Sequence, residues 1–225
     1  MITTKSEYKK RLNEVDLYFN TIQLLDQGQC SVECRDISGS ISTYVIDQEL
    51  SKILKANGFL LLYNLIEATV RNSVVAILNS IVADKLSYRN LSENMKKLWV
   101  RQETKEIKDF NQSRDKIYEM SEKILNDSLL EFKEACVNIS GNIDAQAIRD
   151  LAKQFGYTES TNGRHLQIVK EKRNKLAHGE FTFSEIGKEY TVKDLITLKT
   201  EVTNYIEDVL KNVEDFITDK KYQRV

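Results

Sequence analysis

Proline is absent from this 225-residue chain, although proline makes up about 5% of an average protein. Proline breaks helix interiors because it lacks a backbone donor and its ring clashes with the preceding turn. A long chain without proline is therefore expected to be mostly helical, and the low glycine count of 8 agrees with this. We expect an all-α fold with little or no β structure.

Length and composition suit one soluble domain. With 41% hydrophobic residues, the chain is long enough to bury a substantial core. We expect a single domain over residues 1–225, with an ordered core at about 5–219 and a polar, frayed C-terminal tail at 220–225. The net charge of -1 argues against non-specific coating of nucleic acid, although it leaves room for one local basic site.

The spacing of apolar residues predicts the positions of the helices. Apolar side chains recur every three to four residues over most of the chain. Asn142 and Gly156 are the expected N-cap and C-terminal stop of a short helix, and Thr191 is the expected cap of the last one. Between the first two helices, the segment ISTYVI could be a short strand or an extended loop. The other predicted helices cover residues 5–26, 47–83, 91–110, 114–138 and 164–178.

The predicted helix over residues 47–83 is apolar on nearly all sides, which is typical of a central, buried helix. Its polar exceptions Asn64, Glu67 and Arg71 fall three and four residues apart, on one stripe. Glu67 precedes Arg71 by one turn, in the favourable order for an ion pair within a helix. Charges on a buried helix must be paired or line a site, so the stripe is either a structural pair or part of a functional surface.

The cysteines suggest neither a disulfide framework nor a metal centre. Cys30 and Cys34 are spaced C-x3-C, with no second pair or nearby histidine to complete a zinc site, and Cys136 stands alone. We expect three reduced thiols, no metal and no cofactor. The polar residues 1–16 do not resemble a signal peptide, and the richest apolar run is too short to span a bilayer. We therefore expect a cytoplasmic protein without a membrane partner.

The segment NGRHLQIVKEKRNKLAHGEFTF carries the most chemistry. It holds both histidines of the chain, His165 and His178. It also gathers a local positive charge, which suits a phosphate-bearing ligand. The basic residues of this patch are Arg164, Lys170, Lys172, Arg173 and Lys175, against Glu171 alone.

The spacing within RNKLAH places several polar residues near one another. On a helix, Glu171, Asn174 and His178 share one face, and Arg173 flanks it. Histidine can transfer protons near neutral pH, and arginine can clamp a phosphate through two hydrogen bonds. The same position also suits a structural histidine, because cationic side chains are common at helix C-termini.

The motif RNKLAH at 173–178 resembles the R-x4-6-H motif of HEPN domains. The resemblance extends over most of the chain. Its further blocks are FLLLYNLIEATVRNSV, SGNIDAQAIRDLAKQFGY and HGEFTFSEIGKEYTVKDL. It implies an HEPN-like helical bundle that forms a homodimer. It also implies a metal-independent endoribonuclease, of the kind found among toxins and phage-defence effectors.

The same resemblance implies roles for individual residues. His178 would act as general base or acid on the ribose 2′-OH and the leaving oxygen, and Arg173 would stabilise the charge on the scissile phosphate. Asn174 would orient the phosphate or the histidine. Both protomers would contribute to one composite cleft. The products would be a 2′,3′-cyclic phosphate and a 5′-OH end. A separate antitoxin or defence protein is a further possible partner. Three residues are expected to lie beside the cleft, namely Glu67, Arg71 and Glu171. Four are expected to bind RNA, namely Arg164, Lys170, Lys172 and Lys175.

Two other functions remain open on the sequence. Some HEPN domains bind partners without cleaving RNA, so a catalytically silent dimerisation or adaptor module is one alternative. The segment AQAIRDLAKQFGYTESTNGRHLQIVKEKR also has the layout of a helix-turn-helix, which would suit a DNA-binding regulator. Its connecting loop is longer than the usual tight turn.

Overall fold

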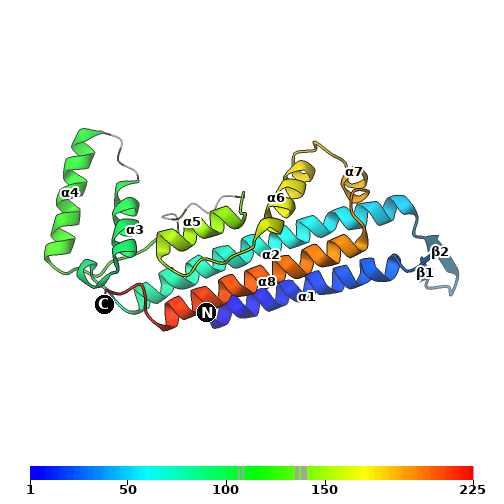
Figure 1. Ribbon diagram of the computed structural model, residues 1–225, viewed down its shortest axis with the longest axis horizontal. Helices are drawn as coiled ribbons and strands as arrows, with labels where there is room; N and C mark the ends of the chain where they lie inside the picture. Colours follow the sequence, from blue (N-terminus) through cyan, green and yellow to red (C-terminus); the bar gives the residue numbers. More distant parts are fainter. Residues whose placement is uncertain (106, 108, 135–136, 138–140, 225) are drawn as a thin grey trace. The chain divides into compact units, whose positions relative to one another are not determined.

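The structure is a computed structural model that describes residues 1–224 except 106, 108, 135, 136 and 138–140. The fold is mostly α, as predicted, with a small two-stranded sheet (Figure 1). In chain order, its elements are α1 (Ile2–Leu25), β1 (Ser31–Arg35), β2 (Ile41–Val45), α2 (Gln48–Ala83), the 3-10 helix η1 (Tyr88–Asn90), α3 (Glu93–Thr104), α4 (Phe110–Leu125), α5 (Ala145–Phe155), α6 (Arg164–Ala177), α7 (Phe183–Gly187) and α8 (Val192–Thr218).

The chain divides into two compact units. Unit 1 comprises residues 1–5, 68–162 and 205–225, and unit 2 comprises residues 6–67 and 163–204. Helices α1, α2 and α8 contribute residues to both units. Our prediction of a single domain over the whole chain stays a prediction.

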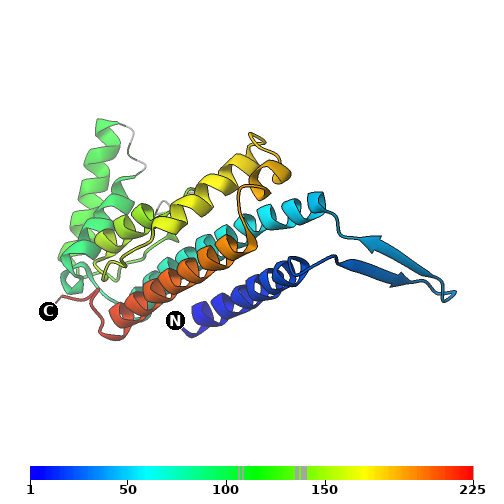
Figure 2. The same cartoon turned by 45° about the vertical axis from the view of Figure 1, so that its right-hand side comes forward.

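Unit 2 contains the segment that carries the motif. In it, α1, α2 and α8 pack through buried side chains that include Phe19, Phe59 and Leu195. The Phe19 ring lies against α2 where Gly58 leaves room, and Lys199 of α8 forms an ion pair with Asp16 of α1. The hairpin β1–β2 joins α1 to α2 and extends beyond their ends (Figure 2).

Short α7 is fixed against α2 by a close backbone approach. A capping box at Thr182 and Glu185 begins α7, and buried Gly187 ends it. A Cβ atom added at Gly187 would lie 1.9 Å from the carbonyl oxygen of Lys52. Only glycine fits at this contact, which joins the segment after the motif to the first half of α2.

Unit 1 is built around the aromatic side chains Trp99, Phe155 and Phe216, which are all buried. Gly156 ends α5 with φ of 92°, a left-handed conformation that glycine adopts without strain. Helices α3 and α4 are joined by ion pairs from Glu103 to Lys116 and Lys123.

Most predicted helices are confirmed, but the helix predicted over 91–110 ends at Thr104, and Phe110 already belongs to α4. Three further local predictions are wrong. The helix predicted over 114–138 ends at Leu125, because Asn126 caps it and Asp127 turns the chain with a φ of 49°. The N-cap of α5 is Asp144, whose carboxylate accepts a hydrogen bond from the backbone of Ala147, and Asn142 lies two residues earlier.

The third wrong prediction is the frayed tail. Tyr222 is 2% exposed and donates a hydrogen bond to Asp84, and the backbone of Arg224 donates to Asn90. The tail is therefore packed as far as Arg224. Cys136 lies outside the described residues, so the prediction of a free thiol there is untested. Cys30 and Cys34 are free thiols, as predicted.

Helix α2 is long and apolar enough to cross a membrane by length and composition, and no other helix in the described part of the chain meets that test. Half of its most apolar window is buried inside the structure. The core helix of a soluble protein passes the same test, so this is weak evidence for a membrane span.

Candidate functional site

The RNKLAH motif forms the C-terminal end of α6. Buried Leu166, Val169 and Leu176 hold α6 on unit 2 through one apolar stripe. The helix ends at His178, whose backbone donates to the carbonyl of Asn174, and Gly179 follows with φ of 68°. The helix predicted over 164–178 is thus confirmed. The side chain of His178 is exposed at this end.

Arg173 lies on the inward side of α6, at the spacing of the apolar stripe. Its guanidinium carbon is 4.3 Å from the centre of the Tyr63 ring on α2, and Tyr63 is 2% exposed. Such a contact is attractive because the ring face carries partial negative charge. Arg173 also donates a hydrogen bond from Nη1 to Oδ1 of Asn174, at 2.9 Å. This hydrogen bond orients the guanidinium of Arg173 and the amide of Asn174 relative to each other.

Arg173 and His178 point in different directions within one chain. A helix turns about 100° per residue, so five residues place the two side chains roughly 140° apart around the axis. Arg173 is half-buried and His178 exposed, in agreement with this separation. The motif of one chain therefore offers an inward-facing cation and an outward-facing imidazole.

Lys172 is held by its own unit. It forms an ion pair with Glu189, and its ammonium lies 5.5 Å from the ring centre of Tyr190. Burial disfavours the charged ammonium, but Glu189 and Tyr190 together attract it and raise the pKa of Lys172. Burial also raises the pKa of the Tyr190 hydroxyl. This side chain connects α6 to the segment before α8, so a packing role competes with the predicted RNA contact.

Tyr190 joins three parts of unit 2. Its carbonyl oxygen accepts a hydrogen bond from Lys55 at 2.8 Å, and its ring meets Phe59 edge to face at 4.9 Å. Together with the Lys172 contact, these interactions attach the segment preceding α8 to both α2 and α6. Tyr190 therefore adds to the contacts that hold α6 on the unit.

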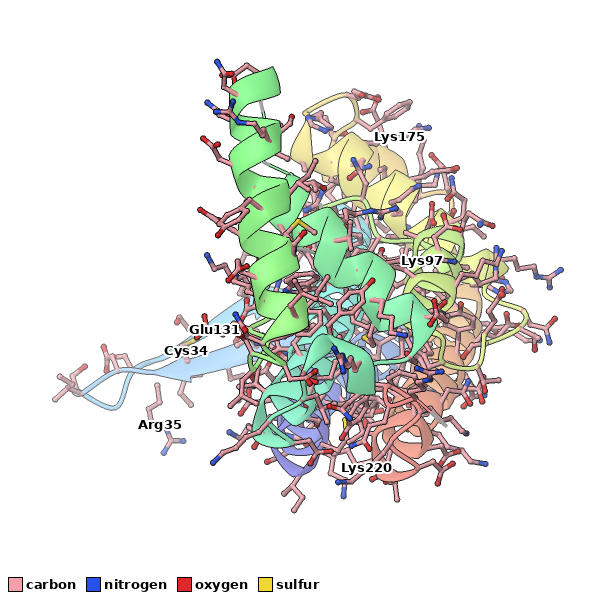
Figure 3. The ribbon with its side chains drawn as sticks, turned by 90° about the vertical axis from the view of Figure 1, so that its left-hand side faces the viewer. Cys34, Arg35, Lys97, Glu131, Lys175 and Lys220 are labelled. Carbon is pink, nitrogen blue, oxygen red and sulfur yellow. The ribbon has the colours of Figure 1, made fainter. Side chains whose placement is uncertain are left out.

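The other predicted RNA-binding residues are more accessible. Arg164 is exposed at the start of α6, and Lys170 and Lys175 are half-buried. The ammonium of Lys175 lies 4.8 Å from the ring centre of Phe181, just beyond the motif. Figure 3 labels Lys175 at the end of α6.

The predicted flanking residues lie near the motif in sequence or along α2. Glu171 is exposed and accepts a hydrogen bond from Gln167. Glu67 is half-buried one turn after Tyr63, which places it on the same face of α2 as the ring beneath Arg173. Arg71, one turn further along, is exposed. Asn64 accepts a hydrogen bond from Arg11 of α1 at 3.0 Å.

The second histidine has a structural environment. His165 is largely buried, and its Nδ1 lies against the carboxylate of Glu201 on α8. This contact connects the first turn of α6 to α8. The two histidines therefore have different surroundings, because His165 is packed against α8 and His178 is exposed.

Two important residues of this region were missed in the sequence. Tyr63 contacts Arg173 and Tyr190 contacts Lys172, and the sequence analysis identified neither tyrosine. The sequence offered one indication for Tyr63, which is its position directly before Asn64 of the polar stripe. In the part of the chain that the structure describes, no group of three or more His, Cys, Asp or Glu side chains is placed to hold a metal ion.

Comparison with known proteins identifies the family. A family model described as MAE_28990-like HEPN matches residues 3–222, nearly the full length of the chain. No curated protein and no solved structure matches the chain. Since the match extends from α1 into the packed C-terminal tail and includes the RNKLAH motif, the chain belongs to the HEPN family.

Proposed function

We propose that the protein is a metal-independent endoribonuclease that acts as a toxin or phage-defence effector. The observation that supports this most is the end of α6, where His178 is exposed and Arg173 is oriented by Tyr63 and Asn174. An exposed imidazole can reach a ribose hydroxyl, and a guanidinium held in place can stabilise a phosphate without reorganising.

The proposed reaction is a transfer within the RNA. His178 takes the proton from the ribose 2′-OH, the 2′-oxygen bonds to the adjacent phosphorus, and the bond to the 5′-oxygen breaks. The leaving oxygen takes up a proton, which gives a 2′,3′-cyclic phosphate and a 5′-OH end. Arg173 stabilises the negative charge on the phosphate in the transition state, and Asn174 orients the arginine.

The active unit in this proposal is a homodimer. Within one chain, the two motif side chains diverge by roughly 140°, so Arg173 and His178 of a single copy do not converge on one phosphate. Two copies related by a two-fold axis can present a histidine and an arginine to the same cleft. Glu67, Arg71 and Glu171 are proposed to line its margin, and Arg164, Lys170 and Lys175 to contact the RNA backbone.

The decisive experiment compares two histidine variants in EDTA. Purified protein is incubated with RNA, and the new ends are sequenced. We expect His178→Ala to cleave about 10²–10⁴-fold more slowly, because general acid–base catalysis is lost. His165→Ala is the matched control on the same helix and should retain most activity. Equal cleavage by His178→Ala and the unaltered protein, or cleavage only with added Mg²⁺, would contradict the proposal.

Arg173→Ala is expected to lose nearly as much activity as His178→Ala, because the guanidinium acts on charge that develops in the transition state. In cells, expression of the unaltered protein should slow growth and expression of either variant should not. The partner that restrains such a toxin would be a separate protein, recognisable by co-purification.

A silent dimerisation or adaptor module is the second candidate. The engagement of Arg173 with Tyr63 and Asn174 favours it, because the same contacts also explain the arginine as a packing residue. Such a module would leave RNA intact and still form a dimer. The helix-turn-helix alternative is weaker, since α5 belongs to unit 1 and α6 to unit 2.

A further inference from the structure

The hairpin β1–β2 leaves backbone hydrogen-bonding groups open on both of its edges. It is a two-stranded antiparallel sheet, and every residue of both strands is exposed. Figure 3 shows the side chains of Cys34 and Arg35 projecting from it. An isolated two-stranded hairpin is marginally stable in water, and an open edge is a template for a further strand.

The register fixes which residues of β1 offer these groups. Asp36 donates to Ser40 and Ile46 donates to Cys30, so the even-numbered residues of β1 hydrogen-bond to β2. Hydrogen-bonded and non-hydrogen-bonded pairs alternate along an antiparallel ladder. The outward backbone groups of β1 therefore belong to the odd-numbered residues Ser31, Glu33 and Arg35.

Glu33 and Arg35 make this edge self-complementary. Both side chains are exposed, and within the described part of its own chain neither forms an ion pair. They lie two residues apart and so on one face of the strand. An antiparallel strand of the same sequence can place its arginine opposite Glu33 and its glutamate opposite Arg35.

We propose that a second copy of this chain pairs with the free edge of β1, with β1 antiparallel to its counterpart and Cys34 on the two-fold axis. Two Glu33–Arg35 pairs across the strands then fix the register. The result is a four-stranded sheet made of two hairpins. This interface goes beyond the proposed nuclease activity and does not depend on it.

Charge excludes the neighbouring registers. The odd-numbered residues of both copies must remain hydrogen-bonded, so the partner strand can shift only in steps of two residues. The two nearest shifts place Glu33 opposite Glu33 or Arg35 opposite Arg35. Like charges directly opposite each other destabilise a sheet. The Cys34 register is thus the one in which both charged residues of each copy meet opposite charges.

The same register brings two thiols together. Cys34 would form a non-hydrogen-bonded pair with its counterpart, and Cα atoms in such pairs lie about 4.5 Å apart. Disulfides form at Cα separations of about 4.4–6.8 Å. Cys34 is exposed and reduced, so it reports directly on the pairing.

The test is oxidation of the full-length chain with Cys30 and Cys136 replaced by serine. Diamide takes two hydrogens from two Cys34 thiols, and the disulfide joins two chains. We expect a covalent dimer on a non-reducing gel at low micromolar concentration. A chain that stays monomeric on the gel overturns the proposal.

Charge reversal provides the specificity control. Glu33→Arg alone and Arg35→Glu alone should each slow cross-linking by roughly tenfold, because two cross-strand pairs change from opposite to like charge. The double variant should restore the rate. The proposed register is overturned if the single variants cross-link at the unaltered rate, or if the double variant does not restore that rate. Melting curves confirm that the hairpin variants remain folded.

A final variant tests whether two copies pair through the outer edge of β2 instead of β1. Thr43→Cys in a chain with Cys34→Ser places the thiol on the outward edge of β2. Rapid cross-linking of this chain, with slow cross-linking through Cys34, would show that β2 pairs instead. Because the readout is a covalent dimer, its failure is distinguishable from a failure of RNA cleavage.

Discussion

Replacing Gly187 by alanine would force α7 away from α2. The new Cβ would stand 1.9 Å from the carbonyl oxygen of Lys52, whereas ordinary van der Waals contact begins at 3.4 Å. The separation must therefore grow by 1.5 Å, which is the difference between these two distances. The obstacle is backbone and belongs to a helix, so it cannot rotate aside as a side chain can.

The free energy of unfolding should fall by about 3 kcal/mol, at the upper end of the usual cost of overpacking. For a chain of this size, each kcal/mol lowers the melting temperature by about 2–4 °C, so we expect a decrease of roughly 6–12 °C. Differential scanning calorimetry of the full-length variant measures it.

Gly28→Ala is the matched control. No atom lies within 4 Å of the position where its Cβ would be, and its φ is not positive. We expect its free energy of unfolding to change by less than about 0.5 kcal/mol. A Gly187→Ala protein that melts within about 2 °C of the unaltered one would refute the close approach of α7 to α2.

Three further predictions concern single side chains. Hydrogen bonds from lysines such as Lys116 outweigh burial and lower the pKa of Glu103, so its stabilisation is present at neutral pH and is lost as pH falls below about 4.5. Glu103→Gln should therefore cost about 1 kcal/mol at pH 7 and little near pH 3, by urea unfolding. Tyr63→Leu should slow RNA cleavage by removing the ring under Arg173, while Tyr63→Phe should retain the rate. Glu67→Gln should lower the melting temperature or the cleavage rate, and a protein unchanged in both would show the polar stripe of α2 to be incidental.

Much of the fold could be predicted because its long helices keep their apolar period. The bounds of α2 and α6 were predicted within one residue, and the capping box at Thr191 correctly placed the start of α8. Five-residue α7 was missed because it is too short for a period to show. Strand β1 was missed because SVECR has no run of β-branched residues. Strand β2 lies within the segment for which either a short strand or an extended loop was predicted.

The error in α4 has a physical cause. Apolar residues continue at helical spacing beyond Leu125, but the chain turns at Asn126 and Asp127, and Leu125 and Leu129 are 67% and 61% exposed. Periodicity reports a possible buried face, and only the tertiary fold decides whether another element covers it.

The candidate site could likewise be predicted only in part. The position of Arg173 on the inward side of α6 follows from its spacing to Leu166, Val169 and Leu176. The ring beneath it does not follow, because Tyr63 lies 110 residues earlier in the chain. Local spacing predicts which way a side chain points, while its partner depends on the packing of distant segments.

The way in which the two units share helices limits how this protein can be dissected. Of their four boundaries, Lys5–Ser6, Glu67–Ala68 and Asn204–Tyr205 fall inside α1, α2 and α8, and Asn162–Gly163 lies between α5 and α6. A protease that cuts at exposed loops would release no complete unit, and no truncation of the gene would encode one. An experiment on either unit therefore requires the whole chain.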